Sequence, residues 1–232
     1  MDRKSRLPNL KPSFERYKYL SQALNEYSLP RALQYEIICN YKLEGKVLDF
    51  GGGANSLYRK ALICDDYSSV NIDPHIEPTW LLKVGETIPC DAEKFDTVFS
   101  LNTLEHIYDA KSVLEDISRV LKKGGEFVTS VPFMFPVHGH PDDFFRPTPS
   151  WYQKALVESG FSEVEVIPLT WGPFSNSSVC SGLPGPAKNL RKKMSLMLDL
   201  LYYKLSVKRR GEEKVNSELE AIATAFFVRA KK

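Results

Sequence analysis

Apolar positions along the chain follow two alternating periods, and these periods predict the order of its elements. Short apolar runs typical of buried strands stand at about 46–50, 70–72, 80–84, 95–101, 126–131, 164–169 and 221–229. Helical spacing or composition follows several of them, at about 56–63, 111–121 and 150–159. Strands that alternate with helices favour an α/β fold, with a mostly parallel sheet and helices on both faces.

Helical spacing also appears ahead of the first strand. Residues 13–27 and 30–43 predict two helices, and Gly45 ends the second region. We therefore expect an N-terminal helical cap over residues 1–45 and a main domain over residues 46–232.

An insertion at about 171–218 separates the sixth run from the last. It opens with loop chemistry rich in glycine and proline over 171–186 and continues as a basic amphipathic helix at about 187–208. A charged turn, 209–214, closes it. The apolar stripe of the helix consists of Leu190, Met194, Met197, Leu201 and Leu205.

A glycine-rich segment, Asp49-Phe50-Gly51-Gly52-Gly53-Ala54-Asn55, follows the first predicted strand. Glycines let the backbone turn tightly and let a ligand approach the main chain closely. A helix starting at Ser56 would offer free N–H groups to an anionic part of that ligand. Asp73 ends the second strand about 20 residues on, a spacing at which an acidic side chain accepts hydrogen bonds from a ribose. The sequence thus predicts an adenosine-containing cofactor.

Composition narrows the class of protein. The chain has 232 residues, is 43% hydrophobic and carries a formal net charge of +2, which suits one α/β domain and gives no overall signature of nucleic-acid binding. The four cysteines are scattered, which favours reduced thiols over disulfides or metal ligation. The first residues lack the apolar core of a signal peptide, and no run approaches the ~18 apolar residues that span a bilayer. We expect a cytoplasmic protein.

Three further segments add to the glycine loop. They are Gly85-Glu86-Thr87-Ile88-Pro89, Ser100-Leu101-Asn102-Thr103-Leu104-Glu105-His106-Ile107 and Leu121-Lys122-Lys123-Gly124-Gly125. In this order and spacing, they and the glycine loop resemble the class I S-adenosylmethionine-dependent methyltransferases over residues 46–169 and, with the last strand, to 230. The resemblance implies a Rossmann-like seven-stranded sheet of order 3-2-1-4-5-7-6 with strand 7 antiparallel.

The resemblance also implies a set of cofactor-binding residues for S-adenosylmethionine, whose product is S-adenosylhomocysteine. The methionine and ribose parts would be held at the glycine loop and the second strand, the adenine at the turn after the third strand, and the floor would come from the end of the fourth strand. The residues are Asp49, Gly51, Gly53, Asn55, Asp73, Gly85, Glu86, Leu101 and Asn102. Asn55 stands where many members have a third glycine, and Val84 where an acidic residue often meets the adenine amine.

The acceptor is expected at the loop after the fifth strand, because ligands of open α/β sheets bind at the carboxyl ends of the strands. Residues 132–148 hold two histidines, two aspartates and one arginine. The segment resembles a methyltransferase subgroup often found in surface-polysaccharide biosynthesis, with the pattern P-x-H-x-x-P-x-D-x-x-R-x-T. The matching positions are Pro136, His138, Pro141, Asp143, Arg146 and Thr148, and His140 falls outside the pattern.

These residues suggest catalytic roles. His138 is the candidate base for a sugar hydroxyl, Asp143 would orient it, and Arg146 would hold a phosphate or carboxylate of the acceptor. Other interpretations stay open: His138 and His140 as part of a metal site, His138 as a loop-packing residue, and Asp143 with Arg146 as a structural ion pair. We expect no metal, because only two ligands lie close in sequence.

The functional prediction is an S-adenosylmethionine-dependent methyltransferase, EC class 2.1.1, that O-methylates a sugar or sugar-phosphate in capsule or O-antigen biosynthesis. The alternatives are methylation of another small molecule, a methyltransferase-like binding module without catalysis, and a nicotinamide oxidoreductase. Nucleic acid is not an expected partner. For the basic helix, over about 187–210, the sequence predicts packing over the domain, a homodimer contact or a peripheral contact with an anionic membrane.

Overall fold

The computed structural model describes residues 9–139, 142–183 and 185–232, which form two compact units. The sheet unit comprises the described residues of Ile38–Val131, His138–Ile167 and Phe226–Lys232. The helical unit comprises the described residues of Met1–Ile37, Pro132–Val137 and Pro168–Ala225. His140 and Pro141, two positions of the predicted acceptor loop, lie outside the described residues.

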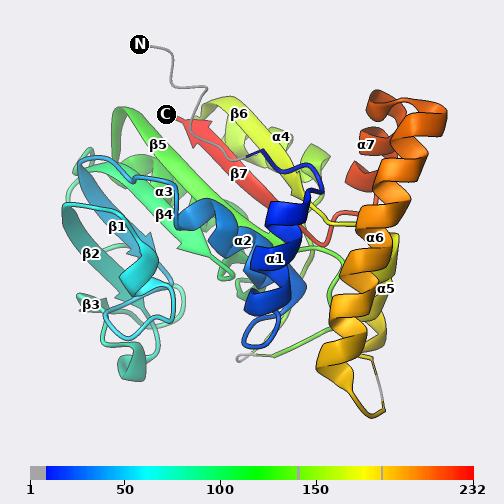
Figure 1. Ribbon diagram of the computed structural model, residues 1–232. Coiled ribbons are helices and arrows are strands. Elements are labelled where there is room, and N and C mark those ends of the chain that lie inside the picture. The colour runs from blue at the N-terminus through cyan, green and yellow to red at the C-terminus, as the bar shows by residue number, and fades with distance from the viewer. Residues whose placement is uncertain (1–8, 140–141, 184) are drawn as a thin grey trace. The chain divides into compact units, whose positions relative to one another are not determined.

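The sheet has seven strands in the order β3-β2-β1-β4-β5-β7-β6, as expected, with β7 antiparallel to its neighbours (Figure 1). The inner strand β1 pairs in parallel with β2 on one side and with β4 on the other. The strands are β1 (Lys46–Phe50), β2 (Asp66–Asn71), β3 (Trp80–Leu81), β4 (Phe95–Leu101), β5 (Leu121–Pro132), β6 (Ser162–Leu169) and β7 (Ala225–Lys231).

The core of the sheet unit lies between the central strands and a helical layer. Val47, Leu48 and Phe99 are fully buried, as runs flanked on both faces require. Helix α3 (Ala110–Val120) buries one apolar stripe and starts where Asp109 accepts the Ser112 N–H. It contacts α4 (Pro149–Glu158), which begins with a proline after its Thr148 cap.

Two expectations for this unit were wrong in detail. The segment 56–63 forms no α-helix but only a 3₁₀ turn, Arg59–Ala61, because the Ser56 hydroxyl is bonded to the Gly53 N–H and Tyr58 is drawn into the core. The glycine pair Gly124-Gly125 lies inside β5 instead of ending α3. The β4–β5 register shifts there, and Gly124 has a φ of +73°, so the pair accommodates an irregularity of the strand.

The helical unit is organised around one long helix, α6 (Lys188–Arg210), which contacts three of its neighbours, α1, α5 and α7. A buried ion pair between Arg16 and Glu36, at 2.6 Å, lies within it, and the same guanidinium lies over the ring of Trp171. The other helices are α1 (Phe14–Ala23), α2 (Leu29–Ile38), α5 (Pro173–Ser181) and α7 (Glu212–Glu220).

The loop expected at 171–186 is partly helical. The charged turn expected at 209–214 is mostly helical too, because α6 ends at Arg210 and α7 begins at Glu212. Helix α5 forms because a distant carboxylate caps it: Asp199 of α6 accepts the N–H groups of Phe174 and Ser175, each at 2.8 Å. Sequence periodicity cannot detect this cap, since its acceptor lies about one helix away along the chain.

The predicted apolar stripe of α6 is largely exposed. Leu190, Met194, Leu201 and Leu205 are each at least half exposed, whereas the opposite side buries Leu196 and Leu200. In the part of the chain that the structure describes, no helix combines the length and apolar character needed to cross a membrane.

The cap on α5 makes a testable prediction about stability. Replacing Asp199 by alanine leaves two N–H donors of α5, one of them buried, without their acceptor, and we expect the free energy of unfolding to fall by about 2 kcal/mol. Urea denaturation followed by circular dichroism measures this. Glu220→Ala, an exposed carboxylate removed from the same unit, is the matched control and should change little; equal stability of Asp199→Ala and wild type would contradict the cap.

Candidate cofactor and acceptor site

The glycine loop is held by its neighbours on both sides. At the end of β1, Gly51 has a φ of +97° and donates its N–H to the Val70 carbonyl, while the Asn71 amide donates to the Gly51 carbonyl at 2.7 Å. A β-carbon at Gly51 would overlap Thr103, and one at Gly53 would overlap the Ile76 carbonyl. Any side chain here would therefore push apart the segments after β1, β2 and β4.

Beneath the loop lies Asp49, which is fully buried. Its carboxylate accepts hydrogen bonds from Tyr67, at 2.7 Å, and from Tyr58, at 3.1 Å, and Arg59 lies over the Tyr67 ring. Burial raises the pKa of Asp49 to about 7, and the two hydroxyl donors only partly oppose that rise. A β-carbon at Gly52 would overlap this carboxylate.

Asp73 lies at the end of β2, where one carboxylate oxygen caps a short turn by accepting the His75 N–H. Asn55 binds the same turn, with its amide to the His75 carbonyl and its backbone N–H to Ile76. Its backbone is not left-handed, so Asn55 does not replace a glycine conformationally; it anchors the glycine loop to the turn after β2.

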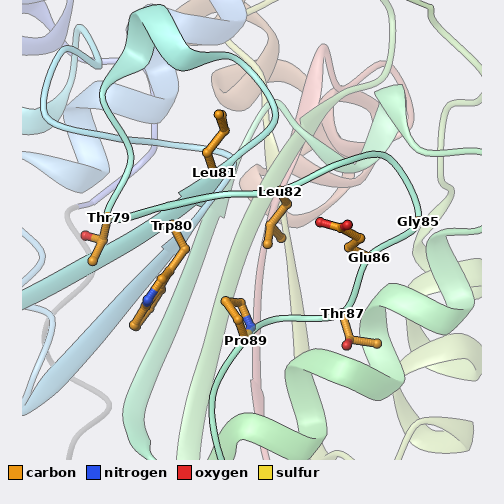
Figure 2. A pocket seen from close by; sticks show the side chains of 8 residues that line it. All are labelled: Thr79, Trp80, Leu81, Leu82, Gly85, Glu86, Thr87 and Pro89. Carbon is orange, nitrogen blue, oxygen red and sulfur yellow. The ribbon is translucent and has the colours of Figure 1, made fainter.

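Gly85 and Glu86 line an open hollow of about 780 Å³ beside β3 (Figure 2). Glu86 turns its carboxylate back to the Lys83 N–H at 2.8 Å. Apolar wall is supplied by Trp80, Leu82 and Pro89. The predicted cofactor residues of the glycine loop are not among those that line this hollow.

The carboxyl end of β4 carries the next two predicted residues. Leu101 is buried. Asn102 has a φ of +50°, a conformation rare for residues other than glycine but least so for asparagine, and it donates its N–H to the Ser130 carbonyl at 2.8 Å. This bend directs the chain to Thr103, which lies against Gly51.

The acceptor loop is organised around Asp143, whose side chain is only 3% exposed. Both terminal nitrogens of Arg146 donate to its carboxylate, and His138 donates its backbone N–H at 3.0 Å. The Arg146 guanidinium lowers the pKa of Asp143 to about 2. The imidazole Nδ1 of His138 lies 3.3 Å from the same carboxylate, so Asp143 faces the ring, and the orienting role expected for it stays a prediction.

The structure also brings two residues to this loop that the sequence did not place in the site. Glu105 and His106 lie on a 3₁₀ turn, Leu104–His106, that follows β4. The rings of His106 and His138 meet edge to face, with centroids 5.3 Å apart, and Phe144 donates its N–H to the Glu105 carbonyl. Glu105 is fully buried. The pKa of Tyr152 is raised, first by the burial of Tyr152 and then by the charge of Glu105.

The predicted residues fall into groups. One contact group consists of His138, Asp143 and Arg146. Another consists of the glycine loop, with Asp49, Gly51, Gly53 and Asn55, and of Asp73 in the turn that the loop contacts. Tyr58 and Tyr67, which fix Asp49, had no recognisable sequence signal. Glu105 and His106 belong to the segment after β4 that the sequence singled out. The contact of His106 with His138 is apparent only from the fold.

Comparisons with known proteins agree with this architecture. Residues 48–129 match the family described as "Methyltransferase domain". A 90-residue stretch is 32% identical to the sarcosine/dimethylglycine N-methyltransferase of Halorhodospira halochloris, and the match covers 34% of this chain and about a third (32%) of that protein's length.

Solved structures share the fold over almost the whole chain. An S-adenosylmethionine-dependent methyltransferase of Thermotoga maritima has a TM-score of 0.55 at 14% identity, covering 93% of this chain and 97% of its own. One from Mesorhizobium loti has a TM-score of 0.54 at 14% identity, covering 90% and 100%. The [4+2]-cyclase SpnF has a TM-score of 0.53 at 13% identity, covering 97% of each chain. Residues 48–129 thus match a methyltransferase domain, and the solved structures share the fold of the chain.

The buried Asp49 makes stability depend on pH. Its pKa is higher in the folded chain, about 7, than in the unfolded chain, about 4, so the folded state holds the proton more tightly between these values. Ionisation of Asp49 therefore costs stability as pH rises through that window. Relative to Asp49→Asn, we expect wild type to lose about 2 kcal/mol between pH 5 and pH 7 and little above that.

Urea denaturation of the cofactor-free protein at several pH values tests this. The exposed Asp91→Asn should retain the wild-type pH dependence. A constant difference between wild type and Asp49→Asn across this range would show that Asp49 is already ionised at pH 5.

Proposed function

We propose that this chain transfers the methyl group of S-adenosylmethionine to a hydroxyl of a sugar or sugar-phosphate in surface-polysaccharide biosynthesis. The observation that supports it most is that one compact unit holds both the glycine loop and a histidine that faces a carboxylate whose side chain is 3% exposed. The methyl transfer would take place in the cytoplasm, where S-adenosylmethionine and sugar nucleotides are made.

For the cofactor, we propose that Asp49, Gly51, Gly53 and Asn55 form the loop that receives the methionine and ribose parts. Asp73 would bind the ribose hydroxyls, with the carboxylate oxygen that does not cap its own turn. Gly85 and Glu86 would lie beside the adenine, recognised through the backbone because the Glu86 side chain is turned to Lys83. Leu101 and Asn102 would form the floor.

Methyl transfer then follows as an in-line displacement. The acceptor oxygen forms a bond to the methyl carbon while the bond from that carbon to the sulfonium sulfur breaks, and S-adenosylhomocysteine leaves. The hydroxyl proton passes to His138. Alignment of the three atoms supplies much of the rate, and a positioned base adds about a hundredfold or more.

Arg146 has a different role in this proposal from the one its residue type suggested. Its two terminal nitrogens are directed to Asp143, so the guanidinium holds Asp143 in place and Asp143 in turn orients His138. Arg146 is thus a positioning residue, and a phosphate or carboxylate of the acceptor is not needed to satisfy it.

Two other functions have specific support. The relative from Halorhodospira halochloris is an N-methyltransferase, which favours an amine or another small molecule as acceptor. The [4+2]-cyclase SpnF shares the fold, so the fold by itself does not require methyl transfer, and a methyltransferase-like binding module without catalysis is the second alternative. Detection of S-adenosylhomocysteine release with sugar nucleotides or amines as acceptors discriminates among these.

His138→Ala provides the direct test of the proposed chemistry. Because the imidazole lies outside the glycine loop, we expect calorimetry to give nearly unchanged affinity for S-adenosylhomocysteine while turnover falls by about a hundredfold or more. His75→Ala removes an exposed imidazole and is the matched control. Unchanged turnover would remove His138 from the mechanism, and absence of S-adenosylhomocysteine binding to wild type would favour the binding module.

For helix α6 we propose a peripheral contact with an anionic membrane face, near lipid-linked acceptors. Its exposed leucines, at 190, 201 and 205, lie along the length of a helix with cations at both ends. Apolar contact plus attraction to anionic headgroups is the usual basis of such binding. A homodimer contact through the same stripe is the competing interpretation.

Flotation with phosphatidylglycerol vesicles tests the membrane contact. Leu201→Glu should weaken vesicle binding by about tenfold, because it removes one apolar side chain from the stripe and adds a repelled charge, and high salt should weaken it further. Val157→Glu, which changes an exposed apolar residue of α4, should bind as wild type does. A chain that does not float, or that dimerises through α6 in sedimentation, would overturn the proposal.

A further inference from the structure

We propose that Glu105, His106 and His138 bind one divalent transition-metal ion, such as Zn²⁺, Mn²⁺ or Co²⁺. One ligating atom from each of the three lies within 4.8 Å of the others. Sequence spacing does not reveal this site, because its two histidines are 32 residues apart and belong to different loops. The inference departs from our expectation of no metal.

One of the three pairs has a separation close to that which a metal requires. Nε2 of His106 lies 3.8 Å from Oε1 of Glu105. Two ligand atoms on one tetrahedral zinc, each about 2.0–2.2 Å from the ion, are separated by about 3.3 Å. A contraction of about half an ångström would therefore bring this pair into a common coordination shell.

The orientation of His106 supports the site independently. Its Nδ1 is hydrogen-bonded to the backbone carbonyl of Asp142, and its Nε2 faces Oε1 of Glu105. A metal-ligating histidine typically donates one ring N–H to a carbonyl or carboxylate, which leaves the other nitrogen for the ion. His138 offers the third ligand atom, and its Nδ1 lies 3.3 Å from the Asp143 carboxylate and 3.5 Å from a terminal nitrogen of Arg146.

The charges around the cluster also suit a cation. Glu105 contributes a carboxylate that is fully buried, and a positive ion beside it would offset the cost of that burial. The guanidinium of Arg146 is near His138, at 3.5 Å from Nδ1, but it is paired with Asp143, so this pair adds no net charge. Two imidazoles and one carboxylate form a donor set suited to zinc and its neighbours more than to magnesium or calcium.

A metal here would deepen the proposed function, on which this role rests. The cluster follows β4 directly, three residues beyond Asn102, and with three protein ligands it would leave a coordination position open for the acceptor hydroxyl. Coordination lowers the pKa of that hydroxyl. The proton would then leave to water, the oxygen would bond to the methyl carbon, and S-adenosylhomocysteine would depart; His138 would act as a ligand in place of a base.

The experiment measures binding of the metal alone to the whole chain. After removal of metals with a chelator, titration with Co²⁺ should produce visible absorption that saturates at one ion per chain, and Zn²⁺ should displace it. His106→Ala and Glu105→Gln should weaken Zn²⁺ binding by more than about a hundredfold, and Asp143→Asn by about tenfold or more. His75→Ala should bind as wild type does.

Circular dichroism shows whether each variant is folded. If His106→Ala does not fold, the near-isosteric Glu105→Gln still tests the site. Absence of saturable Co²⁺ absorption in wild type, or its full retention in folded Glu105→Gln, would overturn the site. Metal binding without binding of S-adenosylhomocysteine would sink the proposed function and leave the metal site standing. If the chain binds no metal and chelator leaves methyl transfer unaffected, the metal site is overturned and the proposed function stands.

Discussion

The site depends on the close approach of three backbone segments at the carboxyl edge of the sheet. The parallel register that pairs Phe50 with Val70 and Asp49 with Phe99 brings the ends of β1, β2 and β4 to one line. There Gly51 lies against Thr103 and Gly53 against Ile76, with no room for a β-carbon at either glycine. The parallel register aligns the ends of the strands. Contact between the segments that follow β1, β2 and β4 additionally requires these glycines, because a side chain at either position would keep the segments apart.

The same constraint explains why Asp49 is buried. With its neighbours so close, the carboxylate lies beneath the loop and receives its hydrogen bonds from two tyrosine hydroxyls. Hydroxyl donors satisfy a buried carboxylate without adding a charge, so the group keeps a raised pKa. Asp143 contrasts with it: a guanidinium holds that carboxylate ionised. The unit thus holds one carboxyl group, Asp49, whose pKa is raised to about 7, and another, Asp143, whose pKa is lowered to about 2.

Much of this could be predicted from the sequence, for physical reasons that differ between elements. Strands β1 and β4 have the predicted bounds because both faces are buried and the apolar run is continuous. Helix α5 and the 3₁₀ turn after the glycine loop could not be predicted, since a cap from Asp199 and a tether from Tyr58 to Asp49 decide them. Local periodicity carries no information about such long-range partners.

The acceptor side shows the same limit more sharply. Asp143 and Arg146 are three residues apart, so their pairing was open to prediction from the loop alone. The approach of His106 to His138 was not, because it depends on how the chain leaves β4. Asn102 adopts a left-handed conformation there, and the turn that follows carries Glu105 and His106 to the loop after β5. A strained residue at a strand end is retained where the surrounding contacts over-determine it. Here those contacts are the Ser130 carbonyl on one side and the Gly51–Thr103 approach on the other, so the glycine loop and the histidine cluster share one structural cause.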